Sequence, residues 1–264
     1  MTPELKKAID EAMTMVALDD LYRPYRPKRK TRATVAKEKG LQGLADIIML
    51  QFLDHPLEEE AVKYINAEKE VLTTEDAIAG AMDIIAENIS DNADYRKSIR
   101  ERTSARGNLI STAKDPEAES VYEMYYDFSS PVSKMTGHRT LAINRGEKEK
   151  FLTVKLEAPV DEIIGYLEKQ NIVRDNKYTT DVLKAAIADS YDRLIAPAIE
   201  REIRNQLTEE AEDGAIKVFG TNLKQLLMQP PITGHTVLGW DPAFRTGCKL
   251  AVVDATGKVL DTKV

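Results

Sequence analysis

The stretch that decides the fold is VLGWDPAFRTGCKLAVVDATGKVLDT, residues 237–262. It contains three β-rich runs separated by turn residues: Val237–Gly239, Lys249–Val253 and Val259–Val264. Because proline cannot donate to a strand ladder, we expect the first strand to end at Asp241 and Pro242. Gly257 can adopt a positive φ, which suits a turn between the second and third runs. The pattern predicts a meander with a carboxylate at the end of its first strand.

Outside this meander the chain reads as a packed array of helices. Thr2–Glu4 predicts a helix start, and apolar residues at helical spacing continue that helix through Val16 and end it before Pro24. Thr73 with Asp76 resembles a capping box ahead of another helix. Shorter helical runs, punctuated by glycine and proline, are expected between these two at residues 34–39, 41–52 and 57–65.

The middle of the chain predicts a small β element among helices. A charged helix is expected at residues 94–106, with its arginines on a solvated face. Two short strands, Asn108–Thr112 and Phe151–Leu156, could pair with one another. Between them, an aromatic run is interrupted at Ser129–Pro131, and a helix is expected from His138, ending at Gly146. We interpret His138 as a packing residue and assign it no catalytic role.

A long helix is expected from Thr179 or Thr180 to about Leu227, where Pro230 and Pro231 end it. Pro197 falls inside this pattern. A proline within a helix costs about 3 kcal/mol, so we expect a kink or a helix restart there.

Composition limits the classes of function. With 42% hydrophobic and 31% charged residues, the 264-residue chain can bury one large core or two smaller ones. No apolar run approaches a membrane span, and the first residues lack the apolar region of a signal peptide, so we expect a cytoplasmic protein without membrane contact. Cys248 is the single cysteine and the three histidines are scattered, so we expect no cofactor and no structural metal.

One segment concentrates positive charge. The net charge of −7 argues against nucleic-acid binding over the whole surface and requires a local basic patch. We call residues 20–32, DLYRPYRPKRKTR, the basic segment; its prolines exclude regular helix. Two tyrosines could stack bases and six cations could contact phosphates: Tyr22, Tyr25, Arg23, Arg26, Lys28, Arg29, Lys30 and Arg32. Alternatively the segment is a connector whose tyrosines pack on the core and whose charges pair with acids. The residues favour neither interpretation.

Three stretches together resemble the Tex family of bacterial transcription accessory proteins. They are the basic segment, HRTLAINRG at His138–Gly146, and GWDPAFRTG at Gly239–Gly247 with the strands that follow. They occur in the family's order and span nearly the whole chain. Trp240 and Ala243 depart from the usual motif, in which a smaller aliphatic residue and a glycine are common at these positions.

The resemblance implies a mainly α fold, in which a multi-helix array with a small β element precedes the first strands of an α/β ribonuclease-H-like domain. We expect residues 1–230 to be the family's N-terminal and central helical region. Residues 231–264 would then begin its YqgF-type domain. Family members are longer, so the chain is expected to be a fragment that lacks the modules most associated with RNA or DNA binding in the family.

Two functions follow from the resemblance. The first is a non-enzymatic scaffold of an RNA-binding transcription accessory protein, which touches the transcription machinery. The alternative is a Mg²⁺-dependent nuclease or resolvase in the full-length protein, with Asp241 as a candidate catalytic carboxylate. Two-metal hydrolysis needs several converging carboxylates, and Asp254 and Asp261 sit at a hairpin where turn acids satisfy backbone donors. We therefore expect no nuclease activity from this chain.

The meander also predicts an unpaired edge. In ribonuclease-H-like sheets the first strand has neighbours on both sides, so a chain ending at Val264 leaves Val237–Gly239 without one of them. An unpaired edge invites another chain. We expect either disorder in Val259–Val264 or self-association through this edge.

Overall fold

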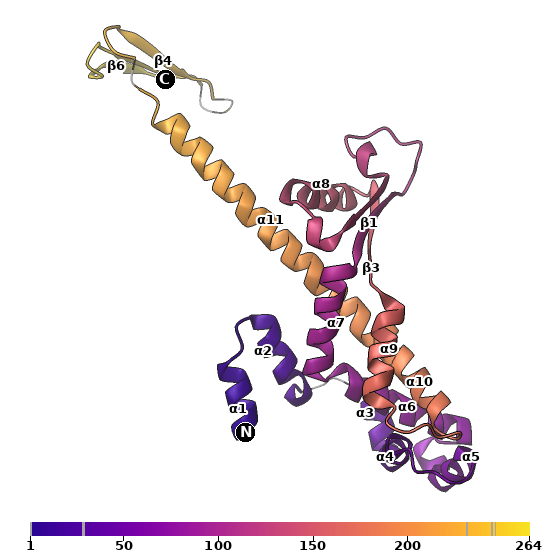
Figure 1. The fold of residues 1–264 in the computed structure, drawn as a ribbon. Helices are drawn as coiled ribbons and strands as arrows, with labels where there is room; N and C mark the ends of the chain where they lie inside the picture. Colours follow the sequence, from indigo (N-terminus) through magenta and orange to yellow (C-terminus); the bar gives the residue numbers. More distant parts are fainter. Residues whose placement is uncertain (1, 28–29, 231, 244, 246) are drawn as a thin grey trace. The chain divides into compact units, whose positions relative to one another are not determined.

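The structure is a computed structural model and describes residues 2–27, 30–230, 232–243, 245 and 247–264. The chain divides into two compact units, Met1–Asp213 and Gly214–Val264. Helices predominate, and the described strands form two antiparallel sheets of three strands each (Figure 1). This confirms the mainly α fold class with a small β element and a terminal meander.

The N-terminal part begins with two short helices, α1 (Pro3–Asp10) and α2 (Met15–Tyr22). Thr2 caps the first, as predicted, by accepting a hydrogen bond from the Leu5 amide. The prediction of one helix through Val16 is wrong, because Thr14 caps a second helix by accepting from the Ala17 amide. The regular helix α2 ends before Pro24, as predicted, and a 3₁₀ turn, η1 (Arg23–Tyr25), then leads towards α3 (Arg32–Glu38).

Helix α6 (Thr74–Ser90) forms the centre of the larger core. Its predicted capping box is confirmed, since Thr73 and Asp76 exchange hydrogen bonds between side chain and backbone. The helices that pack on α6 include α3, α4 (Gln42–Leu50), α5 (Leu57–Ala61) and α10 (Thr180–Asp189). Apolar side chains of α6 are excluded from solvent, among them Ile84 and Ile85. Helices α7 (Ala93–Arg106) and α9 (Val160–Asn171) complete this part.

A sheet with strand order β2-β1-β3 follows α7 in the chain. Its strands are β1 (Asn108–Ala113), β2 (Asp127–Pro131) and β3 (Leu152–Glu157). The predicted pairing of the first and last is confirmed by the register Leu109–Leu156. The prediction that Ser129–Pro131 interrupts regular structure is wrong. These residues belong to the edge strand β2, where a terminal proline leaves the ladder intact.

Helix α8 (Gly137–Lys148) packs on β3. It extends beyond its predicted end at Gly146. That glycine does not stop the helix; it allows α8 to pack closely against β3. A Cβ atom there would lie 2.6 Å from Cδ1 of Leu152. The prediction that His138 is a packing residue is wrong, since its side chain is exposed at the first turn of α8.

Near Pro197, where a kink or a helix restart is predicted, the helix changes type without a break. A π-helical turn, Ser190–Ile195, joins α10 to α11 (Ala196–Leu227). The Ala196 amide donates to the Tyr191 carbonyl, one residue further back than in an α-helix. The turn absorbs the change of register that is needed where the proline supplies no donor. No helix among the described residues is both long and apolar enough to cross a membrane.

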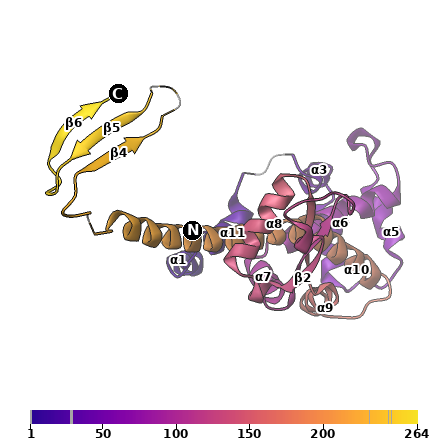
Figure 2. The ribbon, with the colours of Figure 1, turned by 90° about the horizontal axis from the view of Figure 1, so that it is seen from above.

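The second sheet has the strand order β4-β5-β6, with its strands side by side in Figure 2. The strands are β4 (Val237–Asp241), β5 (Lys249–Val253) and β6 (Val259–Lys263), which confirms the meander. Strand β4 lies at an edge, with β5 as its one neighbour among the described residues. Strand β6 is formed, so the expected disorder of its residues is not what the structure has. Pairing with a second copy stays a prediction.

Asp254 organises the turn of this meander. Its Oδ1 accepts hydrogen bonds from the Thr256 hydroxyl at 2.7 Å, the Thr256 amide at 2.8 Å and the Lys258 amide at 3.0 Å. These donors, with the Thr256 side chain first, hold the pKa of Asp254 below its ordinary value. The carboxylate thus satisfies the turn, as expected for a hairpin acid.

The depressed pKa of Asp254 predicts a pH dependence. The stabilisation of the hairpin is fully present above the ordinary aspartate pKa of about 3.9 and is lost as pH falls through the lower folded value. A carboxylate NMR titration of Asp254 should give a midpoint below the ordinary aspartate pKa of about 3.9. Asp254→Asn keeps an acceptor and should perturb the β5–β6 amide shifts less than Asp254→Ala; equal perturbation would contradict the turn role.

Candidate nucleic-acid interface

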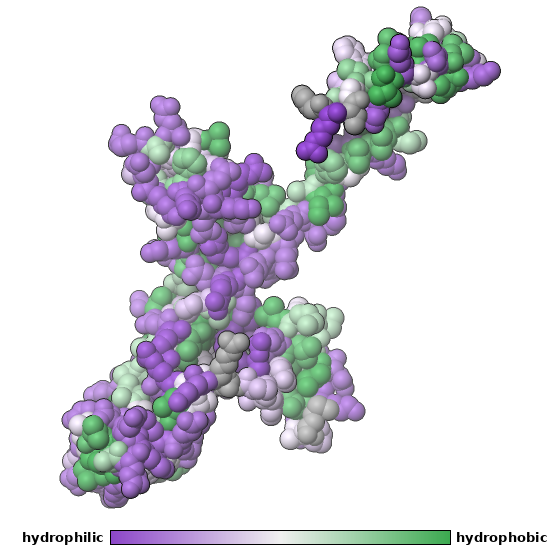
Figure 3. Space-filling view, turned by 180° about the vertical axis from the view of Figure 1, so that it is seen from behind, coloured by the Kyte–Doolittle hydropathy of each residue, from purple (hydrophilic) through white to green (hydrophobic). Residues whose placement is uncertain are grey.

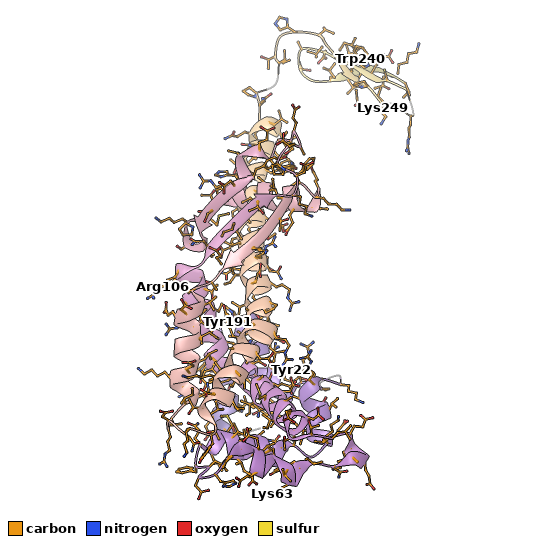
Figure 4. The ribbon with its side chains drawn as sticks, turned by 90° about the vertical axis from the view of Figure 1, so that its right-hand side faces the viewer. Tyr22, Lys63, Arg106, Tyr191, Trp240 and Lys249 are labelled. Atoms are coloured by element: carbon orange, nitrogen blue, oxygen red, sulfur yellow. The ribbon has the colours of Figure 1, made fainter. Side chains whose placement is uncertain are left out.

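The two tyrosines of the basic segment project into solvent. Tyr22, at the end of α2, is 50% exposed, and Tyr25, in the following 3₁₀ turn, is 62% exposed. Tyr22 is labelled in Figure 4. Neither ring belongs to the hydrophobic core. The part of the connector interpretation in which the tyrosines pack on the core is therefore wrong.

The arginines of the segment divide into two groups. Arg23 donates through Nε to Oδ1 of Asp91 at 3.2 Å, and its side chain is 32% exposed. Arg26 is 64% exposed and its guanidinium lies 3.9 Å from Asp19. An exposed pair at that distance contributes little, about 0–1 kcal/mol. The connector interpretation thus describes Arg23, whereas Arg26 keeps its donors available to a ligand.

Lys30 and Arg32 are exposed at the other end of the segment. The structure records no ion pair for either within its described residues, although Arg32 lies close enough to act on acids of neighbouring helices. Burial raises the pKa of Asp83, and the charges of Arg193 and Arg32 oppose that rise. Lys28 and Arg29, which the sequence also proposes as phosphate ligands, lie outside the described residues.

A pocket of about 500 Å³ lies between the segment and α6. Arg23, Arg26 and Thr31 line one side, and Glu87 and Asp91 line the other. The lining therefore carries both signs of charge, and Asp91 accepts a hydrogen bond from Arg23. The outward surface of the segment, with its tyrosines and its remaining cations, is the surface suited to a polyanion.

A buried ionic network holds the start of the segment. Arg96 of α7 is 1% exposed, and Asp20 of α2 is 4% exposed. Nε of Arg96 donates to Oδ1 of Asp20, and Nη2 donates to Oε1 of Glu202 on α11 at 2.6 Å. Arg100 closes the network by donating to Asp20 at 2.7 Å and to Glu202 at 2.7 and 2.9 Å.

This network contradicts one expectation and includes a residue for which the sequence predicted no role. The arginines of α7 were expected on a solvated face, which is wrong for Arg96. Asp20 was not proposed for any role. Asp20 is the one acid in an otherwise basic stretch, and this is the signal that could have marked it. Nη1 of Arg96 has no hydrogen-bond partner among the described atoms.

Comparison with known proteins places the chain in a family. A family profile described as Tex central region-like matches residues 54–219, and one for the Tex protein YqgF-like domain matches residues 235–264. The chain belongs to the Tex family. It is 53% identical to YdcI of Bacillus subtilis, covering 100% of this chain and 37% of that protein. It is 37% identical to protein tex of Bordetella pertussis, covering 99% of this chain and 35% of that one.

A human relative named S1 RNA-binding domain-containing protein 1 is 33% identical over 100% of this chain and 28% of its own length. The Tex-family chain thus spans about a third of the length of these relatives, from 28% to 37%. What the longer relatives do as whole proteins does not follow from this part alone.

Asp241 of this Tex-family chain lies at the end of β4, exposed and opposite Lys249 in the strand register. Among the described residues, no three His, Cys, Asp or Glu side chains are placed to hold a metal ion together. Asp254 is engaged in its turn, and Asp261 accepts from the Thr262 amide at 2.8 Å. The carboxylates that two-metal hydrolysis needs do not converge on Asp241 within the described part of the chain.

The buried network predicts a large and local effect on stability. Arg96→Met leaves the buried Asp20 with Arg100 as its remaining guanidinium, so the free energy of unfolding should fall by about 3–5 kcal/mol. Arg106→Met on the same helix is the matched control. Arg106 is 67% exposed and pairs with Glu162, so its loss should cost about 0–1 kcal/mol. Urea denaturation followed by circular dichroism measures both; equal losses would contradict the role of the network.

Proposed function

We propose that the outward surface of the basic segment binds single-stranded nucleic acid. In this proposal the chain is the scaffold part of an RNA-binding transcription accessory protein and not an enzyme. The observation that carries the proposal is the combination of two exposed tyrosines with three exposed cations, Arg26, Lys30 and Arg32, on one short segment. Cations that track the backbone and rings that stack bases are the usual means of binding single strands.

The names of the relatives support the class of function. One relative, from Neisseria gonorrhoeae, is named transcriptional accessory protein Tex and is 34% identical over 100% of this chain and 35% of its own length. The human relative carries an S1 RNA-binding domain in its name. We infer that modules outside this chain supply most of the affinity for RNA or DNA, that the basic segment adds a local contact, and that the whole protein meets the transcription machinery.

The electrostatics of the chain make the contact local. At a net charge of −7 the protein as a whole repels a polyanion, and the attraction near the segment falls off within a Debye length of about 10 Å at moderate salt. Binding should therefore be weak and strongly salt-dependent. Tyrosine stacking requires unpaired bases, so the single strand is favoured over the duplex.

The cations predict a change in salt dependence. The triple variant Arg26→Gln, Lys30→Gln, Arg32→Gln loses three phosphate contacts. Each contact contributes about 0.7 to the slope of log K against log salt, so the slope should flatten by roughly 2. Fluorescence anisotropy of a labelled oligouridine over a potassium chloride series measures the slope. The matched control replaces three exposed lysines outside the segment, Lys97, Lys169 and Lys184, by glutamine. Its net charge therefore equals that of the segment variant. If the control flattens the slope equally, the segment acts only through the net charge of the protein, and the proposed contact is contradicted.

The tyrosines predict a different signature. Stacking is worth about 1–3 kcal/mol per base and involves no counterion, so Tyr25→Ala should weaken oligouridine binding roughly 5- to 150-fold without changing the salt slope. Tyr25 is 62% exposed, so the fold should tolerate the change. Tyr64→Phe, at a half-buried tyrosine of the helical core, serves as the control for the loss of a tyrosine hydroxyl. Unchanged affinity in Tyr25→Ala would remove the stacking role.

A further inference from the structure

A groove in the larger unit is bounded by three segments: α7, residues 156–160 between β3 and α9, and residues 191–200 where α10 joins α11. Its volume is about 270 Å³. Ile99 and Ile199 form part of its apolar wall, and both are excluded from solvent. Most of the surface of the larger unit that Figure 3 shows is hydrophilic, whereas this wall can shield the alkyl chain of a ligand from water.

Tyr191, in the π-helical turn, brings a phenol to this groove. The residue lines the groove and is 3% exposed; Figure 4 labels it. Within the described residues the Tyr191 hydroxyl has no recorded hydrogen bond, whereas a buried tyrosine usually has a partner for this group. Its oxygen is not one of the fully enclosed side-chain atoms without a partner, so it borders the open space of the groove.

The Tyr191 hydroxyl stays protonated at neutral pH. Burial of the phenol, followed by the nearby charge of Asp192, raises the pKa of Tyr191 above its ordinary value. A protonated phenol donates one hydrogen bond and accepts others. The groove therefore contains a buried polar group that is ready to exchange a hydrogen bond with a ligand.

Carboxylates lie at two points along the α11 side of the groove. Asp192, Ala196 and Glu200 all line it and follow one another at intervals of four residues. At a rise of 1.5 Å per residue, the two acids are roughly 12 Å apart along the helix axis. Glu200 accepts from the Leu156 amide at 3.2 Å through Oε1, which leaves its other oxygen for a ligand. Glu157, next to Leu156 in the chain, is a third acid of the lining.

These acids have no cationic partners in the groove. No lysine, arginine or histidine is among the described residues that line it. The arginines of α7 are paired elsewhere, two in the buried network and two with Glu162 on α9. Arg193 of the π-helical turn donates to Asp189 and Asp83. The potential inside the groove therefore favours a cation.

We propose that the groove binds an aliphatic polyamine. The methylene chain lies on the apolar wall, one ammonium group meets Asp192 and donates to the Tyr191 hydroxyl, and another meets Glu200. Two carboxylates roughly 12 Å apart favour a ligand with two or more charges over the single ammonium group of a lysine side chain. The residues and the ligand differ from those of the proposed nucleic-acid contact, so neither proposal depends on the other.

Isothermal titration calorimetry of the unmodified chain with spermidine tests the proposal. Binding should be saturable and should weaken as salt is raised, because salt screens the attraction between the ammonium groups and the carboxylates. Octanediol, a neutral ligand of similar chain length, should give no saturable heat. Butylamine, which carries one ammonium group, should bind roughly fivefold more weakly than spermidine or weaker still.

A charge variant tests the two acids. Asp192→Asn with Glu200→Gln removes both charges and keeps an oxygen that can accept from the Leu156 amide. Spermidine binding should weaken roughly 5- to 30-fold, because two partly exposed ion pairs are lost. The matched control is Glu117→Gln with Glu119→Gln, at two exposed acids outside the groove. It has the same net charge and should bind spermidine as the unmodified chain does.

A second variant, Tyr191→Phe, separates a ligand contact from a structural role. Because the hydroxyl has no recorded partner within the described residues, its removal should leave the melting temperature unchanged or raise it. The same change should weaken spermidine binding roughly 10-fold, because a hydrogen bond to an ammonium group is lost. Circular dichroism measures the melting temperature, and calorimetry measures the affinity.

Each outcome decides the proposal. Weaker spermidine binding in both groove variants, with the control unchanged, would support it. The absence of saturable binding to the unmodified chain would overturn it, as would equal weakening in the control, because the ligand would then respond to net charge alone. A Tyr191→Phe chain that melts lower and binds spermidine normally would overturn the hydroxyl contact. Tighter binding of acetyl-lysine methylamide than of spermidine would replace the polyamine with a lysine side chain and overturn the inference.

Discussion

The burial of the Arg96 guanidinium is the constraint on which the arrangement of the larger unit depends. A guanidinium that is 1% exposed is tolerated only if carboxylates meet its donors, and the two that do come from residues 76 and 106 positions away in the chain. Asp20 on α2 and Glu202 on α11 are therefore fixed against α7. Apolar packing alone would allow the short N-terminal helices to slide, whereas charge-assisted hydrogen bonds from Arg96 to two carboxylates on different helices define one register.

The same constraint fixes the start of the basic segment, the surface that we propose to bind nucleic acid. Asp20 is held inside the network at one end, and at the other the Thr31 hydroxyl accepts from the Thr34 amide at 3.1 Å while the Thr34 hydroxyl accepts from the Thr31 amide at 2.7 Å. Arg23 is held by Asp91 between these two anchors. Under the proposed function, the described residues held at these points, 20–27 and 30–32, would lose less conformational entropy on binding than a flexible loop does.

The sequence predicts features that depend on neighbouring residues and fails where distant residues decide. The meander, the capping box at Thr73 and the change of helix type near Pro197 follow from turn chemistry, side-chain reach and a missing amide donor, all of which are local. Whether a charged side chain is buried or exposed is not decided by its neighbours in the sequence. Arg96 and Arg106 lie on one helix, and the carboxylates that accompany the burial of Arg96 come from residues 76 and 106 positions away. For the same reason the sequence leaves two interpretations of Tyr22 and Tyr25: exposed side chains that stack bases, or side chains that pack on the core.

The distribution of acids explains how a chain of net charge −7 can present basic surfaces. Charges act on a ligand through their local sum, because salt screens those beyond about 10 Å. Beneath the basic segment, Asp20 is enclosed with Arg96, and Asp91 accepts from Arg23. An internal donor thus holds each of these carboxylates, whereas Arg26, Lys30 and Arg32 are exposed. Internal ion pairs thus have a second effect besides stability: they determine the sign of the potential that a ligand meets.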